Sequence, residues 1–130
     1  KYFDSGLIIC HKTRIRANEV ADMKVIGDVE GKNIIVVDDM IDTAGTICKA
    51  ADMLIDNGAA SVRAVATHAV LSGKAYENIE KSKLTEVIFT DSIPQKQPCS
   101  KIKVLPIAPM FADTIRNIYE HKSISDHFLM

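Results

Sequence analysis

The chain has 130 residues, of which 47% are hydrophobic and 25% are charged, and its formal net charge at pH 7 is −1. This length suits one domain with its own core, and the near-neutral charge excludes the broad basic field of a protein that binds nucleic acid. No apolar run approaches the roughly 20 residues that cross a membrane. We therefore expect a cytoplasmic globular protein that binds neither nucleic acid nor membranes.

The first part of the chain has the pattern of a strand that leads into a basic segment. Leu7–Cys10 is a short apolar run typical of a buried strand, and a cluster of cationic residues follows it. We interpret residues 11–32 as the end of that strand and an exposed flap or hairpin. Lys12 and Arg14 alternate along an extended segment and can therefore face the same side. A solvated basic loop is the simpler interpretation of the same cluster.

An apolar run, two acidic residues and a helix follow one another in the middle of the sequence. Asn33–Val37 is the predicted strand, and Asp38 and Asp39 come directly after it in a predicted turn. A helix is predicted over residues 43–57 because its apolar residues have helical spacing. These are Ile47, Ala50, Ala51, Leu54 and Ile55. Gly58 is the expected end of this helix.

Strands and helices continue to alternate along the rest of the chain. Strands are predicted at residues 61–68, 86–90 and 102–105, and helices at residues 75–80 and 110–119. This order predicts an α/β fold with a mostly parallel sheet flanked by helices on both faces. Ligands of such sheets bind beyond the carboxyl ends of the strands, where Asp38, the loop from His68 to Gly73 and the Asp91–Ser92 turn are expected.

The segment from Asp38 to Thr46 can bind both ends of a sugar phosphate. Its carboxylates can accept hydrogen bonds from neighbouring hydroxyl groups. Its later residues lie at a helix N-terminus, where unpaired N–H groups and the helix dipole favour a phosphate. One alternative is a Mg²⁺-binding strand end beside a P-loop, but the chain contains no GxxxxGK[ST] motif. Another is helix capping by Asp42 or Thr43, which accounts for one residue only. We call residues 38–46 the cradle.

The sequence VVDDMIDTAGT, residues 36–46, resembles the ribose-5-phosphate loop of the type I phosphoribosyltransferase fold. The surrounding motifs make the likeness more specific. Their order and spacing resemble those of ribose-phosphate pyrophosphokinase, also called phosphoribosyl-diphosphate synthetase. The motifs are His11–Arg14, Asn18, Gly27–Val29, Thr67–His68, Leu71–Gly73, Asp91–Pro94 and Ser123–Ser125. The similarity covers nearly the whole chain but only the C-terminal portion of that two-domain enzyme.

The resemblance implies an activity and a set of site residues. The parent protein is expected to convert ATP and ribose 5-phosphate to phosphoribosyl diphosphate and AMP for nucleotide biosynthesis, with Mg²⁺ as cofactor. Lys12 and Arg14 are the expected catalytic residues of the flap, although Thr13 departs from the commoner Lys-Arg-Arg pattern. The residues expected to bind ribose 5-phosphate are Arg14, Asp38, Asp39, Asp42, Thr43, Ala44, Gly45 and Thr46. Asp38 and Asp39 are also possible contacts of the metal.

The same resemblance implies a regulatory site and an assembly. Ser123, Ser125 and Phe128 match positions that bind an effector in regulated members of the family, whereas a disordered polar terminus is the simpler interpretation. The parent protein is expected to form dimers that assemble into hexamers.

We expect residues 1–130 to form a single domain that is a C-terminal fragment of the two-domain synthetase and is inactive alone. Two other functions stay open. A type I phosphoribosyltransferase would use the same cradle to consume phosphoribosyl diphosphate. A non-catalytic regulatory subunit would resemble the synthetase and assemble with it.

Overall fold

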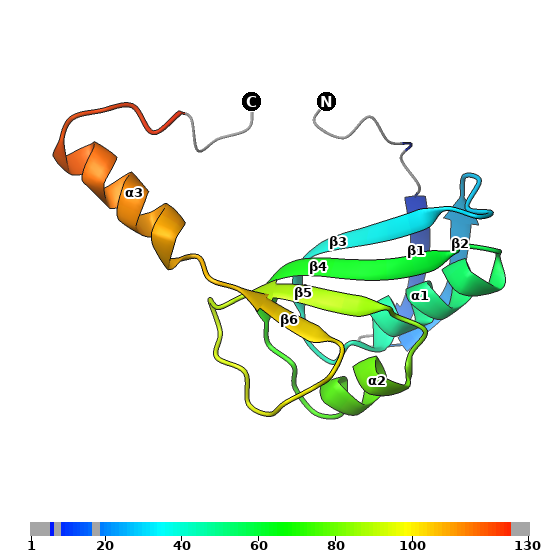
Figure 1. The fold of residues 1–130 in the computed structure, drawn as a ribbon. Coiled ribbons are helices and arrows are strands. Elements are labelled where there is room, and N and C mark those ends of the chain that lie inside the picture. Colours follow the sequence, from blue (N-terminus) through cyan, green and yellow to red (C-terminus); the bar gives the residue numbers. More distant parts are fainter. Residues whose placement is uncertain (1–5, 7–8, 17–18, 126–130) are drawn as a thin grey trace.

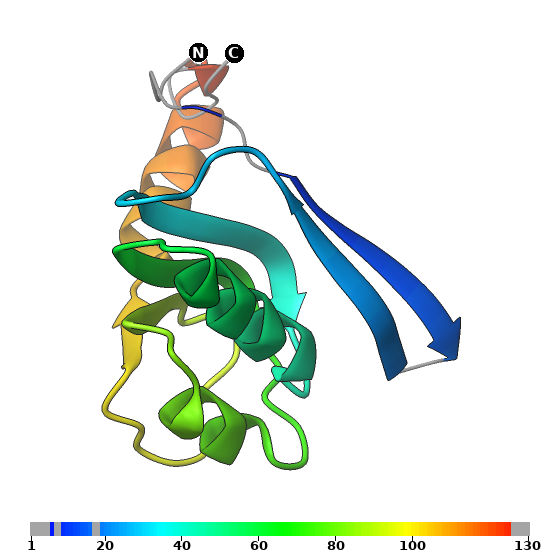
Figure 2. The ribbon, with the colours of Figure 1, turned by 90° about the vertical axis from the view of Figure 1, so that its right-hand side faces the viewer.

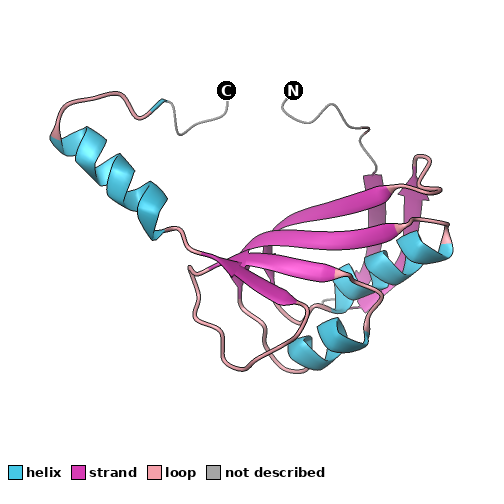
Figure 3. Ribbon diagram, viewed as in Figure 1, coloured by secondary structure: helices cyan, strands magenta, loops and turns pink. Residues whose placement is uncertain are grey.

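A computed structural model describes residue 6, residues 9–16 and residues 19–125, with side chains described at residue 6 and residues 27–125. The chain forms a small parallel sheet with helices and a separate hairpin (Figures 1 and 3). In chain order the elements are β1 (Ile9–Arg16), β2 (Glu19–Ile26), β3 (Asn33–Ile41), α1 (Gly45–Asp56), β4 (Ser61–Ala69), α2 (Ala75–Lys81), β5 (Glu86–Thr90), β6 (Ile102–Leu105) and α3 (Ala108–Tyr119).

The sheet has four strands in the order β3-β4-β5-β6, and every neighbouring pair is parallel. Helix α1 connects β3 to β4, and α2 connects β4 to β5. Because the strands are parallel, their carboxyl ends lie at one edge of the sheet. The predicted mostly parallel sheet flanked by helices is confirmed.

The core lies between the sheet and helices α1 and α2, which cover the same face of the sheet (Figure 2). Fully buried side chains come from each layer: Leu54 from α1, Ile79 from α2, and Val62 and Phe89 from the sheet. Burial alternates along β4 and β5, as expected for strands with one face on the core. This packing fixes the positions of α1 and α2 relative to the carboxyl edge of the sheet.

The opposite face of the sheet, which we expected to be covered as well, is exposed in the described part of the chain. Val37 is 76% exposed and Ile35 is 58% exposed on β3. Helix α3 has no buried residue and projects away from the sheet (Figure 1). The helices of residues 27–125 therefore cover one face only.

The first two strands pair with each other rather than with the sheet. β1 and β2 form an antiparallel hairpin in which Lys12 lies opposite Met23 and Arg14 lies opposite Val20. The hairpin stands apart from the sheet (Figure 2). Its position agrees with the hairpin expected near residues 11–32, and its mobility as a flap stays a prediction.

Several predicted boundaries differ from the structure. β3 continues to Ile41, so Asp38 and Asp39 are part of the strand and not of a turn. The cause is the pairing with β4, which continues as far as Ile41 and Ala69. Helix α1 begins at Gly45 rather than at residue 43. Helix α3 begins at Ala108 rather than at residue 110, with Pro109 in its first turn, where a missing N–H costs nothing.

Replacement of Glu86 with Gln is expected to destabilise the sheet in a pH-dependent way. Lys103 Nζ and Arg63 Nε lie 2.7 and 2.9 Å from its carboxylate oxygens. The hydrogen bonds from Lys103 and Arg63 lower the pKa of Glu86. A lowered pKa in the folded state stabilises the fold above the ordinary value of about 4.3, and this contribution is lost as the pH falls through the lowered pKa.

Urea unfolding from pH 7 to pH 3 measures this effect. Wild type should lose stability steeply at the acidic end, and the Glu86→Gln variant should start lower and lose less. Glu77→Gln is the matched control because its exposed ion pair with Lys81, at 3.5 Å, should contribute little. Parallel pH curves for wild type and Glu86→Gln would contradict the assignment.

Candidate functional site

The cradle lies at the carboxyl edge of the sheet. Asp38 and Asp39 belong to the last part of β3, and the chain then bends through residues 42–44 into α1. The parallel register places Asp38 beside Ala66 and Met40 beside His68 of β4. The structure therefore brings the cradle and the loop after β4 together at this edge, as the sequence predicted.

The bend into α1 leaves the helix N-terminus without a side-chain cap. Ala44 is the residue before the helix, its backbone is left-handed (φ 59°), and no side chain there caps the first turn. The first turn also contains no acidic residue. The residue in the cap position is thus Ala44, and neither Asp42 nor Thr43. A helix start with no acidic residue in its first turn suits an anion.

Segments that follow β4 hold the bend in place. Ser72 Oγ donates a hydrogen bond to Asp42 Oδ1, and the Ser72 amide donates to the Asp42 carbonyl at 3.1 Å. The Leu71 amide donates to the carbonyl of Ile41 at 3.1 Å. Asn78 Nδ2 of α2 donates to the carbonyl of Thr43 at 3.0 Å. Sequence reasoning placed Leu71–Gly73 near the site but did not identify these contacts.

Asp38 and Asp39 offer exposed carboxylates beside the bend. Asp38 Oδ1 accepts a hydrogen bond from the Asp39 amide at 2.9 Å, and Asp39 Oδ1 accepts one from the Met40 amide at 2.7 Å. Neither carboxylate belongs to any of the ion pairs found among residues 27–125.

Hard oxygen ligands of this kind fit Mg²⁺, which commonly uses one or two carboxylates together with waters and substrate phosphates. Within the described residues, no three His, Cys, Asp or Glu side chains gather as a metal cage. Asp38 and Asp39 therefore fit a metal that substrate helps to hold.

The other predicted site residues lie in different parts of the chain. Lys12 and Arg14 belong to β1, and their side chains lie outside the described ones. Ser123 Oγ lies 2.9 Å from Ser125 Oγ in the segment after α3. Phe128 lies outside the described residues. The contact of the flap cations with the cradle and the role of the serines stay predictions.

His68 and the turn after β5 meet at the same edge of the sheet. His68 Nδ1 lies 2.9 Å from Ser92 Oγ, which donates a hydrogen bond to the carbonyl of Thr67 at 3.0 Å. Thr90 Oγ1 donates to that carbonyl at 2.7 Å. This network ties the end of β4 to the end of β5, and it gives His68 a structural partner.

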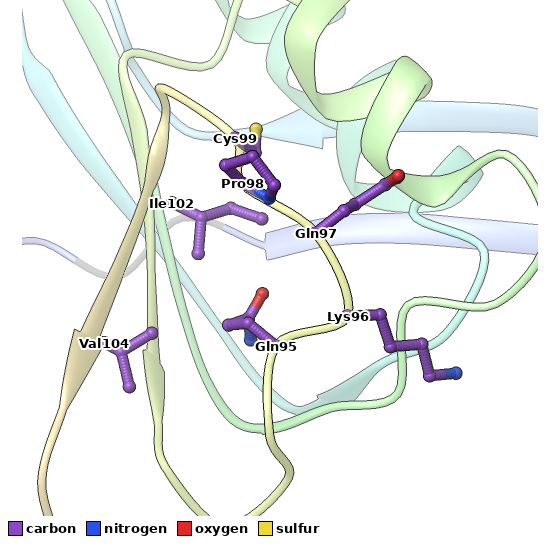
Figure 4. Close-up of a pocket in the computed structure, with 7 residues that line it drawn as sticks. All are labelled: Gln95, Lys96, Gln97, Pro98, Cys99, Ile102 and Val104. Carbon is purple, nitrogen blue, oxygen red and sulfur yellow. The ribbon is translucent and has the colours of Figure 1, made fainter.

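A separate hollow lies beside β6 and does not include any cradle residue (Figure 4). It is lined by Gln95, Lys96, Gln97, Pro98, Cys99, Ile102 and Val104. Tyr76 OH donates to Gln95 Oε1 at 3.2 Å, and the Lys96 amide donates to Tyr76 OH at 3.0 Å. The hollow is thus a feature of the connection between β5 and β6.

A family model described as the phosphoribosyl synthetase-associated domain matches residues 9–129. The chain belongs to this family. The match includes the hairpin, the cradle and the segment after α3, so the resemblance seen in the motifs extends over nearly all residues.

Relatives from several bacteria agree with this family. A ribose-phosphate pyrophosphokinase of Helicobacter hepaticus is 56% identical over 122 residues, which is 94% of this chain and 40% of the relative. One from Porphyromonas gingivalis is 50% identical over 125 residues, or 96% of this chain and 40% of the relative. The chain spans about 40% of the length of these curated relatives.

A solved structure has the same fold. The phosphoribosylpyrophosphate synthetase of Mycobacterium smegmatis superimposes with a TM-score of 0.77 at 40% sequence identity, over 88% of this chain and 37% of that chain. None of the described helices is long and apolar enough to cross a membrane.

Proposed function

We propose that this chain is the part of a ribose-phosphate pyrophosphokinase that binds ribose 5-phosphate and carries the catalytic flap. The observation that carries the proposal is a helix N-terminus with no acidic residue in its first turn, a few residues after two exposed carboxylates. The names of relatives that match 94% and 96% of the chain support it. The parent enzyme would convert ATP and ribose 5-phosphate to phosphoribosyl diphosphate and AMP.

The cradle would bind the two ends of the sugar phosphate differently. N–H groups and hydroxyls of residues 43–46 would hold the 5-phosphate at the positive end of α1. Gly45 has only Thr43 Oγ1 within 4 Å of the position its Cβ would take, at 3.8 Å, so phosphate can approach the backbone closely. The carboxylates of Asp38 and Asp39 would accept hydrogen bonds from the ribose hydroxyls.

The chemical step moves a diphosphoryl group as one unit. The 1-hydroxyl of the ribose attacks the β-phosphorus of ATP, the bond from that phosphorus to the α-phosphate oxygen breaks, and AMP leaves. Bound Mg²⁺ would supply charge neutralisation on the polyphosphate. Lys12 and Arg14 would contact the transferring group and offset the negative charge that develops on it.

The proposal also covers the parent enzyme, its assembly and its effector site. We place these residues as the C-terminal portion of a two-domain cytoplasmic enzyme that self-associates into dimers and hexamers. Ser123 and Ser125, whose hydroxyls lie together, and Phe128 would bind an effector phosphate or nucleotide. Catalysis would need the other domain for most contacts to ATP.

Product formation by the full-length protein tests the proposal. With ATP, Mg²⁺ and ribose 5-phosphate, the protein should release AMP and phosphoribosyl diphosphate in equal amounts, detected by chromatography. Conversion of phosphoribosyl diphosphate and a nucleobase to a nucleotide would instead identify a phosphoribosyltransferase. No turnover in either assay, with retained binding to an active synthetase, would identify a regulatory subunit.

A further inference from the structure

The bend of the cradle needs support from elsewhere in the fold. Ala44 holds a left-handed backbone that costs a residue with a Cβ about 1–2 kcal/mol. The bend also lacks the side-chain cap that commonly fixes the entry into a helix. Other interactions must therefore hold the backbone of residues 42–44 in this conformation.

The support comes from the segment after β4 and from α2. Hydrogen bonds reach three successive carbonyl groups of the chain entering the cradle: the Leu71 amide to Ile41, the Ser72 amide to Asp42, and Asn78 Nδ2 to Thr43. The Ser72 hydroxyl adds a bond to the Asp42 carboxylate. Every carbonyl from Ile41 to Thr43 is thereby directed toward this segment.

This arrangement determines where the opposite ends of the peptide groups point. The C=O and N–H bonds of one peptide plane are antiparallel, so a carbonyl held toward α2 turns the next amide N–H away from α2. The bond from Asn78 to the Thr43 carbonyl therefore sets the direction of the Ala44 N–H. The bond from Ser72 to the Asp42 carbonyl sets the direction of the Thr43 N–H in the same way.

The Ser72 hydroxyl has a second effect. A carboxylate next to a phosphate site repels the ligand unless it is turned away or occupied by a donor. Ser72 Oγ occupies Asp42 Oδ1 and holds that oxygen on the side of the β4–α2 segment. The negative charge of Asp42 is thus kept in a fixed place beside the anion site.

We propose that Ser72 and Asn78 are positioning residues for ribose 5-phosphate: through the side chain of Asp42 and the carbonyl of Thr43, they hold the cradle in its phosphate-binding conformation. The inference rests on the proposed function and adds two residues that act on the substrate only through the cradle. The core fixes both segments in turn, because Leu71, which precedes Ser72, is buried, and so are Ala75 and Ile79 on either side of Asn78 in α2.

Binding measurements on the full-length protein test this inference. Ser72→Ala and Asn78→Asp each remove a donor, and each should weaken the Kd for ribose 5-phosphate by about 5- to 10-fold in calorimetry, as expected for one lost hydrogen bond. The Kd for ATP should change less than twofold. Ser72→Thr keeps the hydroxyl and should restore the wild-type Kd.

The chain offers a matched control for each variant. Ser61 is half-buried like Ser72, and its hydroxyl bonds to a side-chain oxygen, Asn33 Oδ1, at 2.6 Å, but at the amino ends of the strands. Asn57 Nδ2 donates to the carbonyl of Met53 at 2.8 Å at the far end of α1. Ser61→Ala and Asn57→Asp should leave the Kd for ribose 5-phosphate unchanged, whatever they do to the melting temperature.

The outcomes separate this inference from the proposed function. A wild-type protein that does not bind ribose 5-phosphate overturns the proposed function, and this inference with it. A wild-type protein that binds the sugar phosphate, with an unchanged Kd in folded Ser72→Ala and Asn78→Asp, overturns this inference alone. Equal weakening by the control variants would also overturn it, because the effect would then follow general stability.

Discussion

Replacement of Lys12 with Ala in the full-length protein is expected to lower kcat by about 100- to 1,000-fold, the usual effect of removing one charged or hydrogen-bonding group that stabilises a transition state. The diphosphoryl group gains its extra charge only during transfer, so the lost interaction belongs to the transition state and not to the bound substrate. The Kd for ribose 5-phosphate, measured by calorimetry, should therefore stay close to the wild-type value. Steady-state release of AMP gives kcat.

Lys24 provides a matched control for this change. It is a cation of the same hairpin and lies on β2 opposite His11, the residue before Lys12. Lys12 itself lies opposite Met23. Lys24→Ala should retain nearly all of the turnover. Unchanged turnover in Lys12→Ala would remove Lys12 from the mechanism.

The order and type of the elements could be predicted from the sequence because each has a strong local signal. The apolar positions of α1 repeat at helical spacing, and Gly58 provides the positive φ with which a helix commonly ends. The amides of Gly58 and Ala59 indeed bond back to Ile55 and Leu54. These signals are local in the chain, so no tertiary information is needed to recognise them.

Boundaries set by pairing could not be predicted in the same way. Asp38 and Asp39 have low strand propensity and usually mark turns. They remain in β3 because β4 continues to pair with it as far as Ala69. The exposed face of the sheet could not be predicted either. Ile35 and Val37 belong to a continuous apolar run, which is typical of a strand covered on both faces, yet both are exposed.

The candidate site also has a part that could be predicted from local sequence and a part that could not. The cradle is contiguous in sequence, so its acidic residues and helix start were recognisable together. Ser72 and Asn78 lie 30 and 35 residues from the atoms they contact. No local pattern marks a serine or an asparagine as the partner of a distant carbonyl. The left-handed backbone of Ala44 could not be predicted from the sequence either, because glycine is the residue that usually indicates that conformation.

Replacement of Ala44 with Val should disrupt the cradle more than any other single change within it. Ala44 is 4% exposed and has a φ of 59°, a conformation in which a β-branched residue is rarely found. Strain at such a position costs about 1–3 kcal/mol, and overpacking a buried site adds a similar amount. The bend should move to relieve this strain, and calorimetry should show a Kd for ribose 5-phosphate weakened by at least about 10-fold.

Two further variants separate backbone conformation from packing. Ala44→Gly relieves about 1 kcal/mol of left-handed strain and loses a buried methyl group of about 0.8 kcal/mol, so its Kd should remain near that of wild type. Ala51→Val adds the same volume at a fully buried position in the middle of α1, where the backbone is helical. If Ala51→Val weakens sugar-phosphate binding as much as Ala44→Val, overpacking accounts for the loss. If only Ala44→Val does so, the loss follows from the change at the left-handed bend and not from overpacking of the core in general.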